Sequence, residues 1–452
     1  MSIQEKSPDT AMNMKYSNQL RCPTTAYDTA TRNGMIAIRK FTTYISYCLL
    51  MALGPLLLPL LSSVSFAEDD AFVYTINIRD EIGSGIRVYI SNGMEKAKEA
   101  NADAIIFDVD TPGGRVDSAV EIIREIQGTE VPTIAYVNRQ AISAGAMISI
   151  ACDQIVMASG GTIGDSAPVS LQGEEAGEKA VSYIRGTIEA TAERQGRNPH
   201  IAVAMVDKKR VLVRFVDGEI IALRPDAYEN RKEVGEEMEI IADENELLTL
   251  TTGQAFEYDF INGRADSIDE LLAMYQIVEI DGTRTALTKE AIVQKQAELG
   301  NHRVIVVKSL EGASTGEALI TLADRIVIFI TRPMISSLLL SLGMLGLFIE
   351  IRTPGFGVPG MIGLLCVGLF FGGHMLSQIA AEWAALAFVL GIGLIVVEIF
   401  VIPGFGVAGI AGLVLMLGSV FYVLKSAYEL EMAVLSLSLT ILSTLALAVV
   451  AL

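Results

Sequence analysis

The sequence predicts an α/β domain followed by an α-helical membrane domain with several spans. Between residues 70 and 300, short apolar runs alternate with segments whose apolar residues recur at helical spacing, as in strand–helix–strand units with a parallel sheet. After Pro333 the chain changes to apolar stretches near the ~20 residues that a helical span needs. The whole chain is 51% hydrophobic, which is high for a soluble enzyme and agrees with a membrane domain.

The composition excludes some classes of protein. A net charge of −19 argues against nucleic acid as a partner, because so acidic a chain repels phosphates. The four cysteines have neither zinc-site nor disulfide-framework spacing, so we expect no metal and no cofactor. The three histidines, His200, His302 and His374, leave little choice for a histidine general base.

The N-terminal residues indicate export. Residues 1–34 are polar, and we expect a disordered extension or a mis-assigned start. Residues 35–67 follow the pattern of a signal peptide, with Arg39 and Lys40 before an apolar core and small residues before Glu68. An uncleaved anchor is the alternative. Cleavage would place the α/β domain outside the cytoplasm of a bacterial cell, on the plasma or inner membrane.

The α/β domain is expected over residues 68–300. Residues 206–250 read as a strand-rich insertion, and residues 301–333 as a juxtamembrane connector. The connector ends in an amphipathic stretch, Ala323–Thr331, that we expect on the membrane surface. Strands are expected at Tyr74–Ile78, Ala104–Val109, Thr133–Val137 and Gln154–Met157, and helices at Ile86–Ala97, Asp117–Gln127 and Ala144–Ala151.

Residues 334–452 predict the membrane domain, with spans at about Ile335–Ile351, Val358–Met375, Ala384–Ile402, Gly406–Leu424 and Met432–Leu452. They contain an internal repeat, because the pattern of Gly343–Leu364 recurs in Gly391–Leu413, each copy with a Pro-Gly-Phe-Gly loop. Two related hairpins with small residues at their contacts are therefore expected. We expect Glu350 and Glu398, near the helix ends, to be interfacial or to cap the partner repeat, in preference to transporting ions.

Two segments of the α/β domain could carry chemistry. Asp108–Val116 (DVDTPGGRV) leaves a buried strand, and its Gly113 and Gly114 could point backbone N–H groups at an oxyanion; an ordinary turn is the alternative. Asn138–Ile150 places Ser143 in a small-residue loop directly before an apolar helix. There Ser143 could be a nucleophile or simply an N-cap.

A nucleophilic serine needs a base, and residues 144–199 contain no histidine. A lysine can take this role where burial or nearby positive potential favours its neutral form. Lys179, at the N-terminus of a helix that ends near Gly196, is one such candidate. A solvated lysine in the first turn of a helix is the alternative.

In combination, DTPGGRVDSA, AISAGAMIS and GGTIGDSAPV resemble the Clp-protease/crotonase superfamily. The whole chain resembles the NfeD family of membrane-bound Clp-class serine proteases. That likeness includes KAVSYIRGTIEATAERQGRNPHIAVAMV and SSLLLSLGMLGLFIEIRTPGFGVPG and covers about residues 70–430. It implies a ClpP/crotonase-like ββα superhelical protease domain. Long members of the family end in a small soluble β-barrel, which this sequence lacks, so we expect a variant or a truncated chain.

The resemblance also implies roles for individual residues. Ser143 matches the family's nucleophile, and Lys179, seventeen residues before the Gly-Arg-Asn turn, matches its base. Backbone N–H groups of Gly113 or Gly114 and of Ala144 would hold the oxyanion.

The implied function is a membrane-anchored serine endopeptidase that cleaves hydrophobic peptide segments. Its partners would be the lipid bilayer and stomatin- or prohibitin-like membrane proteins, and a homo-oligomer, dimeric or higher, is plausible for the fold. Three alternatives stay open: a non-catalytic scaffold for stomatin-like proteins, a signal-peptide-peptidase-like enzyme, and a crotonase-like acyl-CoA enzyme. The last is disfavoured because an exported domain meets little CoA.

Overall fold

The computed structural model describes residues 70–169, 176–352, 357–377, 382–401, 406–428 and 430–451. The predictions for the N-terminal extension, the signal peptide and most of both Pro-Gly-Phe-Gly loops lie outside these residues. Residues 70–452 belong to one unit of the chain.

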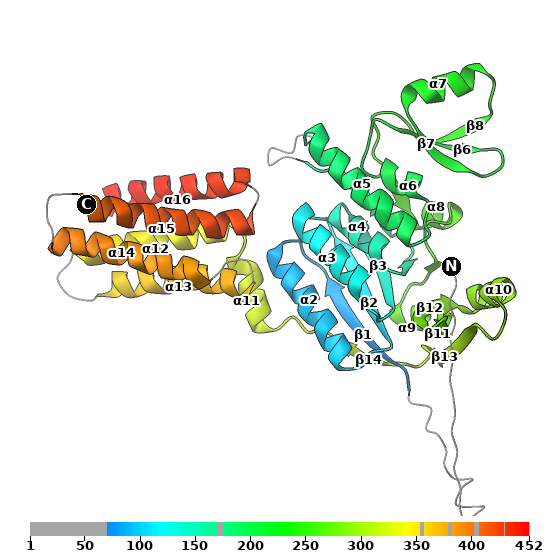
Figure 1. The fold of residues 1–452 in the computed structure, drawn as a ribbon, viewed down its shortest axis with the longest axis horizontal. Helices are drawn as coiled ribbons and strands as arrows, with labels where there is room; N and C mark the ends of the chain where they lie inside the picture. The colour runs from blue at the N-terminus through cyan, green and yellow to red at the C-terminus, as the bar shows by residue number, and fades with distance from the viewer. Residues whose placement is uncertain are drawn as a thin grey trace, which may run out of the picture. The chain divides into compact units, whose positions relative to one another are not determined.

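The α/β domain is built on a sheet with strand order β10-β4-β3-β2-β1-β14, parallel at each step. Figure 1 labels β3, β2, β1 and β14 of this sheet. At the end of β3, β5 continues the pairing in parallel, and β9 pairs with β5 in antiparallel fashion. The strand β2 is buried along nearly its whole length, as its apolar run predicts. The strands are β1 (Phe72–Ile78), β2 (Ala104–Thr111), β3 (Thr133–Ile142), β4 (Gln154–Met157), β5 (Thr162–Gly164), β9 (Thr249–Thr251), β10 (Gly263–Arg264) and β14 (Ser314–Glu317).

Helices cover one face of this sheet and enclose the larger core. Ile105 and Phe107 of β2 point into this core, where they join apolar side chains from α2 to α6. Every residue of α4 is buried, so this helix lies in the middle of the layer. The helices are α2 (Ser84–Glu99), α3 (Val116–Gly128), α4 (Ala144–Ala151), α5 (Glu178–Arg194), α6 (Pro199–Ala204) and α8 (Thr252–Glu257).

The other face of the sheet carries a smaller core around Ile106, Tyr136 and Tyr275, which α9 and an antiparallel three-stranded sheet cover. A second three-stranded sheet forms the insertion expected at residues 206–250 and has a small core of its own. The elements are α9 (Ile268–Met274), β11 (Tyr275–Ile280), β12 (Thr283–Thr288), α10 (Lys289–Leu299) and β13 (Val304–Ser309), then β6 (Val211–Phe215), β7 (Ile220–Leu223), α7 (Pro225–Glu233) and β8 (Met238–Ala242).

The region expected as a connector, residues 301–333, differs from that expectation in its first half. It contributes β13 to the three-stranded sheet and β14 to the edge of the main sheet, where Ser314–Glu317 pairs in parallel with Phe72–Thr75. Its second half forms the short helix α11 (Leu322–Ile330). The amphipathic stretch was therefore predicted at the right place, whereas the two strands were missed.

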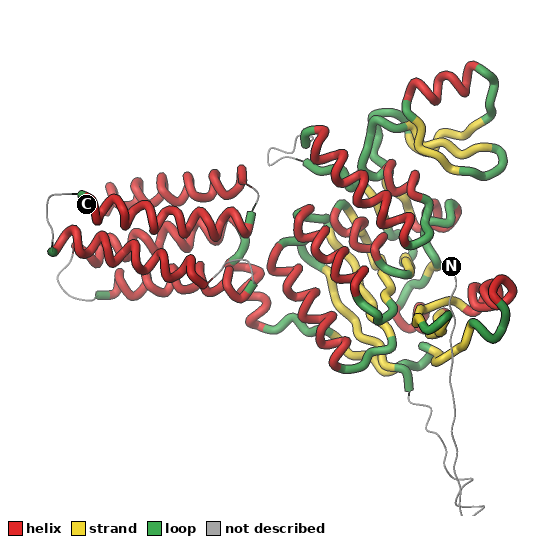
Figure 2. Tube along the Cα trace, viewed as in Figure 1, coloured by secondary structure: helices red, strands yellow, loops and turns green. Residues whose placement is uncertain are grey.

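Five apolar helices follow, each long and apolar enough to span a membrane. From Leu322 onwards the described residues are helices and connecting turns (Figure 2). The predicted spans and the observed helices agree to within a few residues. The helices are α12 (Pro333–Arg352), α13 (Val358–Leu376), α14 (Glu382–Phe400), α15 (Val407–Ala427) and α16 (Leu430–Ala451).

The internal repeat appears as two hairpins of the same design, α12–α13 and α14–α15. A Cβ added to Gly363 would lie 2.9 Å from the Gly343 carbonyl oxygen, and one added to Gly412 would lie 2.5 Å from that of Gly391. Only glycine allows these helices to approach so closely.

A glutamate closes each hairpin. Glu350 accepts hydrogen bonds from the backbone N–H groups of Gly357 (2.6 Å) and Gly360 (2.9 Å). Glu398 accepts the equivalent bonds from Gly406 (2.5 Å) and Gly409 (3.2 Å). Each carboxylate thus caps the next helix of its own repeat, where the unpaired N–H groups favour negative charge, whereas the sequence had suggested an interfacial position or a cap on the partner repeat.

Candidate active site

Ser143 lies between β3 and α4 in a conformation that side chains rarely adopt. Its φ is 55° and its ψ is −117°. Such a backbone costs about 1–3 kcal/mol and is concentrated at functional sites. Although Ser143 occupies the N-cap position of α4, its side chain makes no capping hydrogen bond. Helix capping therefore does not explain the presence of a serine at position 143, because the Ser143 hydroxyl does not cap α4.

The end of β5 holds the backbone of Ser143 on both sides. The Ser143 N–H donates to the Gly164 carbonyl (2.9 Å), and the Ser166 hydroxyl donates to the Ser143 carbonyl (3.2 Å). Ser166 is buried, and it is a site residue that sequence reasoning missed. The motif GGTIGDSAPV was its only signal.

The Gly113–Gly114 turn lies against Ser143. A Cβ added to Gly113 would lie 2.5 Å from Ser143 Cβ and 3.1 Å from its Oγ, and the φ of Gly113 is +107°. Backbone hydrogen bonds to Ile82 fix the turn, because the Ile82 N–H donates to the Gly113 carbonyl and the Arg115 N–H donates to the Ile82 carbonyl, both at 2.7 Å. Two predicted site segments, 30 residues apart in sequence, are thereby brought together.

The hydrogen bonds of this turn distinguish its two glycines. The Gly113 N–H donates to Thr111 Oγ1 (3.1 Å), which itself donates to the Asp80 carbonyl (2.8 Å). In the described part of the chain, no protein acceptor is recorded for the N–H groups of Gly114 and Ala144. Of the predicted oxyanion donors, Gly114 and Ala144 are therefore the available pair, and Thr111 is a second residue that the sequence reasoning missed.

Lys179 is not assembled with the other predicted residues. It lies in the first turn of α5 and is exposed. Across residues 70–169 and 176–352, no hydrogen bond or ion pair links its side chain to Ser143. Its neighbour Glu178 forms an ion pair with Lys209 at 2.9 Å.

A buried arginine binds backbone carbonyls at the C-terminal end of α4, the helix that follows Ser143. Arg197, in the Gly-Arg-Asn turn after α5, donates to the carbonyls of Ile150 and Asp153, both at 3.1 Å. Burial lowers the pKa of Arg197 to about 10, so it stays a cation at neutral pH. Burial also raises the pKa of the Cys152 thiol beside it, which keeps this thiol unreactive.

A groove of about 550 Å³ lies between α3 and the start of α5. Its walls include Val116, Val120, Val169, Ala180 and Tyr183. α3 begins two residues after Gly114, and Lys179 lies in the first turn of α5, so the groove borders one helix that follows the glycine turn and one that carries Lys179. The lining also includes the charged residues Asp117, Glu121, Arg124 and Glu431, so the groove has a mixed apolar and charged surface.

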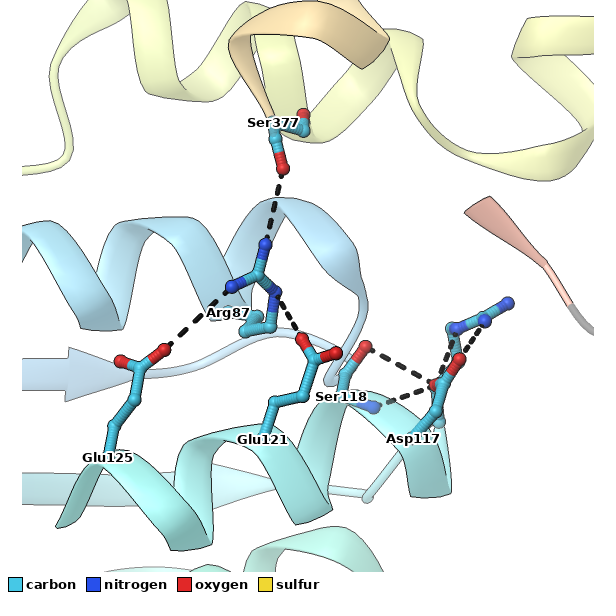
Figure 3. A network of polar contacts seen from close by, with 7 residues as sticks. Arg87, Asp117, Ser118, Glu121, Glu125 and Ser377 are labelled. Carbon is cyan, nitrogen blue, oxygen red and sulfur yellow. Dashed lines mark hydrogen bonds and ion pairs between the residues drawn. The ribbon is translucent and has the colours of Figure 1, made fainter. Parts of the chain in front are cut away.

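Polar contacts connect α3 with residues at the ends of the membrane helices. Arg87 of α2 pairs with Glu121 Oε2 (3.0 Å) and Glu125 Oε1 (3.8 Å) of α3, and it donates to the Ser377 carbonyl (3.3 Å), as Figure 3 shows. The Arg115 guanidinium lies 5.7 Å from the ring centre of Tyr428, within cation–π range. The residue that follows the glycine turn is thus in contact with the membrane domain.

Within the described residues, no group of three or more His, Cys, Asp or Glu side chains is placed to share a metal ion. In the same part of the chain, a serine with a strained backbone lies beside the Gly113–Gly114 turn, and no base is recorded in contact with it.

Comparison with known proteins identifies the family. Residues 72–237 match the family described as "NfeD1b, N-terminal domain", and residues 334–452 match the "NfeD integral membrane domain". The chain is 33% identical over 370 residues to membrane protein NfeD1b of Bacillus subtilis (strain 168), covering 82% of this chain and 71% of that protein. The chain belongs to the NfeD family. It is a multi-pass membrane protein, as the five apolar helices and the family's membrane domain both indicate.

A second relative of this NfeD chain is the membrane-bound protease PH1510 of Pyrococcus horikoshii. It is 28% identical over 355 residues, covering 76% of this chain and 66% of the relative. Similar solved structures include a mutant of the 1510-N membrane-bound stomatin-specific protease in complex with a substrate peptide (TM-score 0.40, 24% identity, 58% of this chain and 98% of that one). They also include ClpP1 of Listeria monocytogenes (TM-score 0.31, 14% identity, 44% and 94%).

Proposed function

We propose that this NfeD chain is a membrane-anchored serine endopeptidase in which Ser143 is the nucleophile and Lys179 the general base. A protease is the function named for the relative PH1510, and a serine with a lysine base fits a domain whose site segments lack histidine. The observation that carries the proposal is the conformation of Ser143: a positive φ, a hydroxyl that caps nothing, and the Gly113 backbone against it.

In the proposed mechanism, the Lys179 amine accepts the proton of the Ser143 hydroxyl as its oxygen attacks the peptide carbonyl. The N–H groups of Gly114 and Ala144 hold the oxyanion, and each such donor typically lowers the barrier by about 3 kcal/mol. The protonated Lys179 then delivers its proton to the leaving amine. Water hydrolyses the acyl-enzyme, with Lys179 again as the base.

This mechanism requires the first turn of α5 to approach Ser143 when a peptide is bound. Catalytic hydrogen bonds are often long or absent until substrate is present. The groove supports such an approach, because Ala176, Gly177 and Ala180, on either side of Lys179, line it. A peptide in the groove would contact the segment that carries the base.

We further propose that the substrates are hydrophobic segments of stomatin- or prohibitin-like membrane proteins, bound on the extracytoplasmic side. A relative's solved structure is described as that of a stomatin-specific protease, and the groove of this chain has Val116, Val120 and Val169 among its lining residues.

Cleavage of a hydrophobic peptide by the full chain in lipid nanodiscs tests the proposal. Ser143→Ala and Lys179→Ala should each lower kcat by roughly 10³-fold or more, because each removes a member of one catalytic unit. Ser149→Ala and Lys295→Ala are matched controls, because the Ser149 hydroxyl donates to the Gly145 carbonyl within α4 and Lys295 is on the surface of α10. Full activity of either site variant would overturn the dyad.

A non-catalytic scaffold is the second candidate, and the exposure of Lys179 favours it. A scaffold would bind a stomatin-like protein equally well before and after the Ser143→Ala substitution, and it would cleave nothing in either form. Measuring binding and cleavage on the same Ser143→Ala preparation, beside the unsubstituted chain, separates the two functions.

A further inference from the structure

The short helix α11 has an exposed apolar face. Leu322, Ile326 and Phe329 are 76%, 45% and 53% exposed, and their spacing of four and three residues puts them on one side of the helix. Leu319, just before the helix, is 70% exposed. Large apolar side chains gathered in this way indicate a surface that is covered in the cell.

The opposite face of α11 is already packed. Ile328 lies against Gly85 of α2, where an added Cβ would be 2.9 Å from Ile328 Cα. At the C-terminal end of α11, Ile330, which is four residues after Ile326, is buried against Gly373 of α13, where an added Cβ would be 2.4 Å from its Cδ1. Rotation of α11 therefore cannot bury the exposed face, since both glycines fix its orientation.

The exposed face is continuous with the lipid-facing surface of the first span. α12 begins at Pro333, three residues after α11 ends, and Met334 and Leu338 of α12 are 85% and 54% exposed. α12 is long and apolar enough to cross a bilayer, so its exposed apolar side chains contact lipid. A helix so close to the end of a span is at the level of the membrane–water interface.

The charged residues of α11 fit this level. Arg325 is exposed on α11. Its neighbour Asp324 is the acidic residue of this helix, and within the described chain no ion pair between the two is recorded. Arg332, at the start of the first span, lies 3.8 Å from Asp80. Long arginine side chains can reach the phosphates of the interface while their neighbours insert among acyl chains.

We propose that α11 lies in the interfacial layer of the bilayer, with Leu322, Ile326 and Phe329 inserted among the lipid acyl chains. The occupant of the exposed face is thus lipid. Because Ile328 contacts Gly85, α11 would also support the first turn of α2 at the membrane surface. The α/β domain would then reach peptide segments near the bilayer. The lipid contact itself does not depend on the proposed protease activity.

Spin-label accessibility tests this placement in the full chain. Ile326→Cys and Phe329→Cys are each labelled with a nitroxide, in a chain whose four native cysteines are replaced by alanine and which is held in phosphatidylcholine–phosphatidylglycerol nanodiscs. Collision with oxygen, which concentrates in lipid, is compared with collision with a water-soluble nickel chelate. Leu338→Cys is the lipid reference, and Val293→Cys, 66% exposed on α10, is the water reference.

Both labels on α11 should resemble the one at residue 338, with at least fivefold greater preference for oxygen over nickel than at residue 293. Nickel accessibility equal to that at residue 293 would show that the face is in water and would overturn the proposal. Exclusion of both reagents, with spin–spin broadening between chains, would show a second copy on this face and overturn it as well. Exclusion without broadening would indicate a protein cover and have the same consequence.

Discussion

At the level of single residues, Ser143 owes its backbone strain to contacts on both sides. Gly164 and Ser166 bind its N–H and its carbonyl, and Gly113 lies against its side chain. A strained residue persists only where its surroundings determine it so fully. The sequence could indicate Ser143 and Gly113, because a serine before an apolar helix and a double glycine after a strand are visible locally. It does not show the roles of Thr111 and Ser166, although both lie in the quoted motifs, because their hydrogen bonds depend on the folded loops.

Gly113→Ala should damage catalysis more than folding. The new Cβ would lie 2.5 Å from Ser143 Cβ, and the φ of +107° disfavours alanine. We expect a loss of about 1–3 kcal/mol of stability and of roughly 100-fold or more in peptide cleavage, because displacement of Ser143 also displaces the oxyanion donors. Thermal unfolding and cleavage rates check both. Gly128→Ala is the control, since a Cβ there has no neighbour within 4 Å; equal activity of the two variants would contradict the predicted contact.

The stability that Asp207 gives to the region around α5 should fall in acid. Burial by itself raises the pKa of Asp207, but hydrogen bonds from Arg185, the Lys209 backbone and Arg210 outweigh it and lower the pKa below 3.8. A lowered pKa means that the stabilisation is present above about pH 3.8 and is lost as pH falls through the folded value.

Asp207→Asn should therefore cost about 1–3 kcal/mol at pH 7, and its Tm should approach that of the wild type in strong acid. Circular dichroism melting at pH 7 and below pH 3 measures the difference. A Tm gap that is equally large at both pH values would contradict this account. Asp217→Asn, in the surface turn between β6 and β7, should leave the Tm unchanged.

Among the secondary-structure elements, the helices and central strands were predictable because their apolar periods are strong and local. β13 and β14 were missed because both are short and exposed along most of their length, so no burial pattern marks them. β14 exists because its backbone pairs with β1, at the other end of the domain in sequence. Residues 301–317 belong to the sheets for a reason that only the tertiary structure supplies.

The capped hairpins can be tested through the single tryptophan. Glu398 accepts backbone N–H bonds at the start of α15 (Gly406, Ala408 and Gly409), so Glu398→Ala should cost the α14–α15 hairpin about 1–3 kcal/mol. Glu398→Gln, which keeps one acceptor oxygen, should be intermediate. Trp383 of α14 lies 4.4 Å from the Tyr422 ring of α15, so its fluorescence reports separation of the two helices during titration with sodium dodecyl sulfate.

Glu431→Gln provides the control, because Glu431 is exposed in the first turn of α16. If Glu398→Ala separated the helices at the same detergent concentration as Glu431→Gln, the capping role would be wrong. Ion transport by these glutamates, which we disfavoured from the sequence, would then return as their explanation.

For the molecule as a whole, hydrophobic patterning predicts the order of the two domains, the parallel sheet and the five apolar helices. The resemblance to the NfeD family is confirmed. The site was only partly predictable. Motifs indicated which segments meet, and the structure joins the glycine turn to Ser143. Lys179 lies exposed in the first turn of α5, and no hydrogen bond or ion pair is recorded between it and Ser143 in the described chain, so its pairing with the serine stays a prediction.

The central claim is that Ser143 becomes acylated by substrate and that Lys179 enables it. The most direct measurement is mass spectrometry of the full chain, quenched in acid during cleavage of a hydrophobic peptide. We predict an adduct with the mass of the N-terminal peptide fragment on the tryptic segment that contains Ser143, and no adduct in Ser143→Ala or Lys179→Ala. Cleavage without an adduct and unchanged in Ser143→Ala, or an adduct on another residue, would contradict the claim.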